Sequence, residues 1–288
     1  MFKNKDYKEI EKFISKFNVH SFNNKKFVDE YKSFFSLQDF CENIPEDNFE
    51  YKNNELERTV AENEQKPFEP EFNDLCRLHY LLLNRRVLTA LEFGSGFSTV
   101  IMAHAMELLD SEYRNWASEN TRIDNPFSVH SIEVNKKFIE ITESRLKMKG
   151  LKKSNIHASK VEVGLHDNRV VTFYSNLPNI SPDLIYIDGP TVYDSNETIN
   201  GFALNHKFRM PMSADVLKFE FYLEPGTLIL VDGRTANSRF LRSYLRRNWN
   251  YFHDMEGDVH YFELNEEPLG KLNQVKIDFC LKNKWLLE

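Results

Sequence analysis

Short apolar runs alternate with amphipathic stretches along the chain from residue 87 onward. The runs have the length of buried strands, and the stretches between them carry apolar residues three or four positions apart, as helices packed on a sheet do. Strands that alternate with helices favour a parallel sheet with helices on both faces. The sequence therefore predicts a doubly wound, mostly parallel α/β fold. The expected strands are 87–93, 128–133, 183–188 and 227–232, and the expected helices are 98–109, 136–148, 214–222 and 238–248.

The beginning of the chain shows a different pattern. Aromatic and aliphatic residues recur at helical spacing within 7–17 and again within 27–35, which predicts two amphipathic helices. A polar stretch rich in Asn and Glu follows at 46–66 and has the composition of a linker. We therefore expect residues 1–66 to form an N-terminal helical extension and linker.

The main domain is expected to comprise residues 67–288. Two prolines mark its entry, and a helix is predicted at 71–84. Near the end of the chain, 259–264 and 275–280 are short segments that mix apolar and polar residues. We expect them to form a pair of closing strands.

Composition narrows the classes of protein. The chain has 288 residues, of which 41% are hydrophobic, and this suffices for a buried core. Its net charge of −7 lacks the basic footprint of most nucleic-acid-binding proteins. We interpret the basic cluster Arg242, Arg246 and Arg247 as a solvated helix face. The expected partner is a small molecule and not a nucleic acid, and the sequence leaves the oligomeric state open.

Cysteines and apolar runs bear on the compartment. Cys41, Cys76 and Cys280 are widely spaced and form neither a disulfide framework nor the CxxC spacing of a zinc site, which fits a reducing compartment. The N-terminus is too polar for a signal peptide, and no apolar run approaches the roughly 20 residues that cross a bilayer. We expect a cytoplasmic protein without a membrane span.

The segment LEFGSGFST, residues 91–99, is the strongest chemical signal in the sequence. It lies where the first expected strand meets the next helix. Gly94 and Gly96 allow a tight turn and a close approach of a ligand to the backbone, and Ser98 or Thr99 is placed to cap the helix. In an open parallel sheet, ligands bind beyond the carboxyl ends of the strands, where this turn lies. A glycine-rich turn without a ligand is the alternative.

Two acids and one threonine narrow the choice of ligand. Glu92 stands two residues before Gly94, where a carboxylate can meet a cationic ligand. Glu133 ends the second expected strand, where a carboxylate can accept hydrogen bonds from ribose hydroxyls. Thr99 takes the place of the third glycine of a dinucleotide fingerprint, where Gly or Ala is needed for close packing of helix on strand. The turn therefore favours a small cofactor without a pyrophosphate over NAD.

LEFGSGFST resembles motif I of the class I S-adenosylmethionine (SAM) dependent methyltransferases, whose loop holds the methionine part of SAM. Segments 132–133, 183–190 and 223–234 resemble the ends of later strands in that family, so the resemblance covers about 87–248. It implies a Rossmann-like methyltransferase domain that binds SAM. The residues implied to bind SAM are Glu92, Gly94, Ser95, Gly96, Ser98, Thr99, Glu133 and Asp188.

Two features depart from the family's pattern. Glu92 and Glu133 are 41 positions apart, farther than usual in the family, and we assign the excess to a surface insertion at 111–126. In the family, a residue after the third strand faces the adenine. It has no clear counterpart between 157 and 176.

The catalytic candidates follow two central strands. Asp188 and Asp232 end adjacent strands and therefore point into one crevice. Acids at similar places hold Mg²⁺ in catechol-type O-methyltransferases, where the second acid is followed by Asn. Here Gly233 follows Asp232. Two roles stay open for both acids. They hold a metal ion, or they orient loops or substrate hydroxyls.

Three further residues are candidates on the acceptor side. His206 lies in the connection between these strands, where a histidine can deprotonate an acceptor hydroxyl. A surface histidine without a catalytic role is the alternative. Arg209 and Arg234 are candidates for holding a carboxylate or phosphate of the acceptor.

These observations predict methyl transfer from SAM to a hydroxyl, or less readily an amine, of a small acceptor such as a sugar or another metabolite. Two other functions stay open. One is an NAD(P)-dependent Rossmann oxidoreductase, against which Thr99 counts. The other is a non-catalytic SAM-binding or scaffold protein, against which the acids at the strand ends count. Mg²⁺ stays open as a second cofactor.

Overall fold

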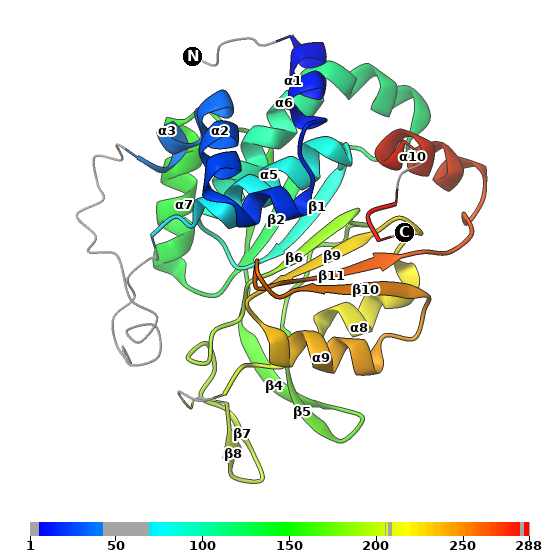
Figure 1. The fold of residues 1–288 in the computed structure, drawn as a ribbon. Helices are drawn as coiled ribbons and strands as arrows, with labels where there is room; N and C mark the ends of the chain where they lie inside the picture. The colour runs from blue at the N-terminus through cyan, green and yellow to red at the C-terminus, as the bar shows by residue number, and fades with distance from the viewer. Residues whose placement is uncertain (1–5, 43–68, 205, 207–208, 283–284, 288) are drawn as a thin grey trace.

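A seven-stranded sheet forms the centre of the molecule (Figure 1). The computed structural model describes residues 6–42, 69–204, 206, 209–282 and 285–287, so the predicted linker at 46–66 lies outside the described residues. The strands in spatial order are β10 (Trp249–Asp254), β11 (Val259–Leu264), β9 (Leu228–Asp232), β6 (Leu184–Ile187), β1 (Thr89–Phe93), β2 (Ser128–Glu133) and β3 (Ser154–Ala158). Five neighbouring strands, from β9 to β3, are parallel to one another. Strand β11 pairs in antiparallel direction with both of its neighbours, β9 and β10. The predicted doubly wound, mostly parallel sheet is confirmed.

Both faces of the sheet are covered. Ala90 of β1 joins the core on one face, whereas Leu91 and Phe93 join the core on the other. All five residues of β1 are buried, as expected of a central parallel strand. On the first face lie α5 (Phe72–Asn84), α6 (Phe97–Asn120), α7 (Lys136–Met148) and α10 (Lys271–Leu281), and on the second α8 (Asp215–Phe219) and α9 (Thr235–Tyr244).

The N-terminal extension is helical, as predicted, and it is part of the main core. Phe13 and Phe34 stack with their ring centroids 3.7 Å apart. The hydroxyl of Tyr80 on α5 donates to the carbonyl of Phe17 at 2.9 Å. The extension therefore packs on α5 as a layer of the main domain, and its predicted boundary at residue 66 stays a prediction. Its helices are α1 (Tyr7–Ile14), the 3₁₀ helix η1 (Val19–Asn23), α2 (Lys25–Phe35) and α3 (Gln38–Cys41).

The predicted strand at 275–280 is wrong. This segment belongs to α10, whose buried residues Asn273, Ile277 and Cys280 recur at helical spacing. Packing of these residues on the core decides the structure, although the alternation of apolar and polar residues in the same segment resembles a strand. The predicted strand at 259–264 is confirmed as β11, and its partner is β10, which the sequence analysis missed.

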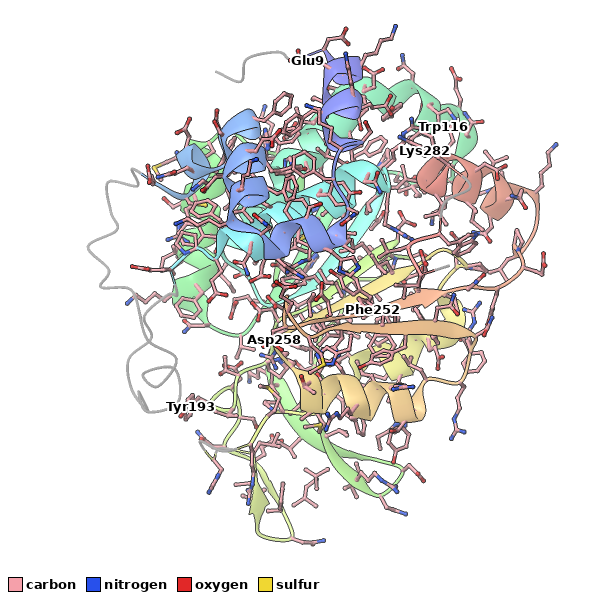
Figure 2. All side chains as sticks on the ribbon, in the orientation of Figure 1. Glu9, Trp116, Tyr193, Phe252, Asp258 and Lys282 are labelled. Carbon is pink, nitrogen blue, oxygen red and sulfur yellow. The ribbon has the colours of Figure 1, made fainter. Side chains whose placement is uncertain are left out.

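The predicted surface insertion at 111–126 is also corrected. Most of it extends α6, which runs without a break to Asn120. Trp116 stacks on Phe279 of α10 with ring centroids 3.5 Å apart, and Tyr113 meets the same ring at 5.1 Å. Figure 2 labels Trp116 beside Lys282, at the end of α10. The extra length therefore forms a packing surface for the C-terminal helix.

Two hairpins extend beyond the sheet on the side of α9 (Figure 1). The first lies between β3 and β6, and the second belongs to the long connection from β6 to β9. The same connection contains α8 and a 3₁₀ helix before it enters β9. The elements are β4 (Val161–His166) with β5 (Arg169–Tyr174), β7 (Thr198–Ile199) with β8 (Phe202–Ala203), and η2 (Glu220–Tyr222).

Neither a membrane helix nor a disulfide is found among the described residues. No described helix is long and apolar enough to cross a bilayer. Cys41, Cys76 and Cys280 are buried free thiols.

A buried pair of histidines links α2, α5 and α6. The hydroxyl of Tyr31 lies 3.0 Å from Nδ1 of His79, and Nε2 of His79 lies 3.0 Å from Nδ1 of His104. Burial lowers the pKa of His104 to about 3 and lowers the pKa of His79 well below its usual value. The folded protein therefore holds both rings neutral, although an unfolded chain protonates them below about pH 6.5.

His104→Asn is expected to flatten the acid loss of stability. The contribution of His104 is fully present above about pH 6.5 and falls by about 1.4 kcal/mol per pH unit as the pH drops toward 3. Denaturant unfolding at several pH values measures the slope. The exposed His206 provides the matched control, since His206→Asn should leave it unchanged. An equal slope in wild type and His104→Asn would contradict the prediction.

Candidate functional site

The turn between β1 and α6 depends on two glycines in different ways. Gly94 has a φ of +115°, which strains a residue with a side chain, and its N–H donates to the carbonyl of Ile132 on β2 at 2.9 Å. Gly96 has a φ of 167°, which is extended backbone open to any residue. A Cβ added at Gly96 meets no protein atom within 4 Å. The turn therefore needs Gly94 for its conformation, whereas Gly96 borders open space.

Glu92 lies beneath this turn and ties α6 to the sheet. Its side chain is 1% exposed, and its carboxylate accepts hydrogen bonds from the hydroxyls of Ser98, Thr99 and Ser131. Burial raises the pKa of Glu92 to about 7, and the three hydroxyls oppose the shift. Thr99 also caps α6 by accepting the N–H of Gly96 at 3.1 Å. These contacts give Glu92 a role in positioning the turn. Its predicted contact with a cationic ligand stays a prediction.

Glu133 stands beside the turn at the end of β2. Its Oε2 accepts a hydrogen bond from the hydroxyl of Ser95 at 3.0 Å, and its Oε1 accepts the N–H groups of Val134 and Asn135, each at 2.8 Å. Burial raises the pKa of Glu133, and these hydrogen bonds oppose the shift. The predicted ribose-binding acid and the glycine turn are therefore brought together.

An open pocket of about 530 Å³ adjoins Glu133. One wall follows β2, and the other comes from the loop after β6, where Figure 2 labels Tyr193. The second wall was not predicted, because nothing in the sequence indicates that the loop after β6 returns to β2. The lining residues are Val134, Asn135, Lys136, Lys137, Glu140, Tyr193 and Asp194.

Asp188 and Asp232 follow neighbouring strands, as predicted. Ile187 pairs with Val231, so the two carboxyl ends lie side by side. The carboxylate of Asp188 has no hydrogen bond or ion pair with any residue that the structure describes, whereas Asp232 accepts the hydroxyl of Tyr186 at 2.6 Å. Desolvation of the carboxylate by the surrounding protein, and then the charge of Asp232, raise the pKa of Asp188 to about 7, although the residue as a whole is exposed.

Helix α5 brings a third acid to this edge of the sheet, which the sequence analysis missed. Asp74 pairs with Arg77, whose side chain is 1% exposed. Burial and then the charge of Asp232 raise the pKa of Asp74 to about 8. Arg77 also donates to Asn23 of the N-terminal extension at 3.0 Å. The three-residue spacing of Asp74 and Arg77 indicates an ion pair on a helix, but it does not show which strand end the helix covers.

The three other candidates lie around the connection between β6 and β9. Arg234 is buried, and its guanidinium donates to the main-chain carbonyls of Asp188 at 2.6 Å and Pro190 at 2.9 Å. Arg209 donates to the carbonyl of Ala203 and lies over a ring of the β7–β8 hairpin. His206 is exposed in the same connection. Arg234 thus holds the loop that follows Asp188. The role of His206 as a base and the acceptor-binding roles of Arg209 and Arg234 stay predictions.

The fit of Mg²⁺ can be tested on the residues themselves. Among the described residues, no group of three or more His, Cys, Asp or Glu side chains is arranged to hold a metal ion. Asp188 and Asp232 supply two carboxylates, and one of these already accepts a hydrogen bond from Tyr186. The donor set therefore does not fit a metal centre held by the protein.

Comparisons with known proteins give matches of fold. No family model matches the chain, and a search of curated proteins finds no relative. Among solved structures, this chain is similar to the O-methyltransferase TomG from Streptomyces achromogenes in complex with SAM. The two share 15% sequence identity with a TM-score of 0.38, and the match covers 75% of this chain and 92% of that one. It is also similar to an O-methyltransferase from Bacillus cereus in complex with SAH, at 15% identity and a TM-score of 0.41, over 82% and 96%. A third match is the SAH-bound methyltransferase PaMTH1 from Podospora anserina, at 14% identity and a TM-score of 0.38, over 82% and 96%.

Proposed function

We propose that this protein transfers a methyl group from SAM to a hydroxyl group of a small acceptor. The observation that carries the proposal is a row of groups along one edge of the sheet. Glu133 ends β2, the glycine turn follows β1, and Asp188 and Asp232 end β6 and β9, in the spatial order of the strands. Ligands of open α/β sheets bind along this edge.

The turn and Glu133 are suited to the cofactor. The open space at Gly96 lets a ligand approach the backbone, and Glu133 Oε2 accepts only one hydrogen bond among the described residues, which leaves capacity for a ribose hydroxyl. Asn135 and Tyr193 line the neighbouring pocket, which has room for the adenine ring of SAM. Thr99 and Ser131 hold the turn rigid through Glu92.

Asp188 is assigned the role of base. Bound SAM supplies an electrophilic methyl group on a sulfonium sulfur. Asp188 would accept the hydroxyl proton of the acceptor as the acceptor oxygen takes the methyl group, with S-adenosylhomocysteine as the leaving group. The raised pKa of Asp188 suits this step, because a base works best when its pKa lies near the working pH. Alignment of the acceptor oxygen with the methyl group supplies the remaining part of the rate enhancement.

A thermal-shift panel with SAM, S-adenosylhomocysteine, NAD and buffer tests the cofactor. A ligand that binds the folded chain raises its apparent stability, so SAM and S-adenosylhomocysteine should raise the Tm while NAD does not. A shift with NAD alone would replace the proposal with an oxidoreductase. A shift with SAM but no methylated product from a panel of sugars and other hydroxyl compounds would favour a binding protein without turnover.

Glu133→Ala is expected to weaken SAM binding by about 1.5–3 kcal/mol, because a carboxylate makes charge-assisted hydrogen bonds to ribose hydroxyls. Isothermal titration calorimetry measures the loss. Ser95→Ala is the matched control. It removes the partner of Glu133 Oε2 but keeps the carboxylate, so its effect should be smaller. An affinity within twofold of wild type in Glu133→Ala would place the ribose elsewhere.

A further inference from the structure

We propose that a second site, between the β4–β5 hairpin and α9, binds a tetrahedral dianion such as a phosphate or sulfate group of a ligand. The pocket has a volume of about 560 Å³ and is open to solvent. None of the acids at the sheet edge lines it, and its residues on α9 lie about 6–14 Å along that helix, which begins three residues after Asp232. Its lining residues are Asp167, Arg169, Arg239, Phe240, Ser243, Tyr244 and Arg246.

The lining of this pocket is positively charged. Three guanidinium groups and one carboxylate give the lining a formal charge of +2, in a chain whose net charge is −7. The carboxylate of Asp167 pairs with Arg169 at 3.1 Å. Neither Arg239 nor Arg246 has a side-chain hydrogen bond or ion pair with any residue in the described part of the chain. Two cations without an anionic partner thus face one pocket.

Neighbouring arginines have other partners, and α9 ends at Tyr244, before Arg246 and Arg247. The sequence suggested one solvated face for Arg242, Arg246 and Arg247. In the structure, Arg247 pairs with Glu266, and Arg242 lies 4.4 Å from the ring centroid of Tyr251. Only Arg246 of the three lines the pocket.

The hairpin is held against α9 by its rings. Asp167 and Asn168 have φ values of 48° and 59°, as in a tight two-residue hairpin turn, and this turn fixes the position of Arg169. The ring of His166 meets that of Tyr244 at 5.0 Å, and the guanidinium of Arg169 lies 5.5 Å from the Tyr244 centroid. Figure 1 shows the hairpin beside α9. The site is therefore built from two elements that contact each other.

The chemistry of the lining favours a dianion. A guanidinium presents paired N–H donors that match two oxygens of a phosphate or sulfate. The charge of +2 balances a dianion, whereas a single carboxylate balances half of it. The hydroxyl of Tyr244 adds a neutral donor to the lining, whereas the hydroxyl of Ser243 already donates to the main-chain carbonyl of Arg239 at 2.9 Å.

Calorimetric titration of the full chain with inorganic phosphate and with sulfate tests the proposal, without SAM and at an ionic strength kept constant with NaCl. Saturable binding of at least one of the two anions is expected at pH 8. Arg239→Gln and Arg246→Gln should each weaken it by roughly tenfold. Arg242→Gln is the matched control, since it removes the same charge from α9 outside the pocket, and it should stay within about twofold of wild type.

Four results separate the outcomes. Binding of phosphate alone assigns a phosphate ligand, and binding of sulfate alone assigns a sulfate ligand. Titrations that do not saturate up to roughly 10 mM overturn the proposal. An equal loss in Arg242→Gln also overturns it, because the effect would then be a general attraction of anions. If a glutamine variant does not fold, Arg239→Lys keeps the charge but not the paired donors, and it should still weaken binding.

Discussion

Gly96→Val is expected to abolish SAM binding while the chain stays folded. The reason is steric. A Cβ at this position meets no protein atom within 4 Å, and the φ of 167° is accessible to valine, so neither packing nor backbone opposes the change. The added side chain instead fills the space above the turn that the proposed cofactor needs. We expect a loss of roughly a hundredfold or more, about 3 kcal/mol.

Calorimetry with SAM measures the loss, and a denaturant titration confirms the fold. Gly94→Val is the contrasting variant, because Gly94 has a φ of +115° and a side chain there strains the turn. It should lower the free energy of unfolding, which Gly96→Val should not do. A folded Gly96→Val protein with wild-type SAM affinity would remove the glycine turn from the cofactor site.

The fold was largely predictable because its central strands carry two signals at once. Residues 87–93, 128–133, 183–188 and 227–232 are short apolar runs, and turns or acids follow them where a parallel sheet binds ligands. The ends of the chain were harder to predict. Residues 275–280 fit a period of two and also one face of a helix, and contacts of α10 with the extended α6 decide between these structures.

The candidate site was predictable only in the positions of residues at strand ends. Glu133, Asp188 and Asp232 lie at the predicted strand ends because the ends of adjacent parallel strands must lie together, and their roles stay predictions. The partners of these acids depend on side-chain contacts between elements distant in the sequence. Ser131 reaches Glu92, and Tyr186 reaches Asp232, through positions that look like ordinary strand residues.

Removal of divalent ions should leave turnover unchanged. The described residues offer no group of three metal-binding side chains, so the proposed mechanism assigns the proton to a carboxylate. Assays in EDTA, with and without added Mg²⁺, measure this. Loss of activity in EDTA that Mg²⁺ restores would return Asp188 and Asp232 to the role of metal ligands.

Asp188→Asn is expected to lower kcat by a factor of roughly 10²–10⁴, the usual contribution of a general base. Only the ionised carboxylate accepts a proton, and the pKa of Asp188 is raised to about 7, so wild-type activity should rise with pH through about 7 and level off above it. Asp188→Asn should lose this rise and keep its affinity for SAM. The rate of methyl transfer between pH 5 and 9 is the measurement.

Two further variants distinguish a base from a group that only positions the acceptor. The charge of Asp232 helps to raise the pKa of Asp188, so Asp232→Asn should move the rise in activity to lower pH. A purely structural role of Asp232 predicts no such displacement. His206→Ala should leave the profile unchanged, because His206 is exposed in the connection outside the acid pair. A profile that is flattened in His206→Ala and intact in Asp188→Asn would make His206 the base and leave Asp188 to orient the acceptor hydroxyl.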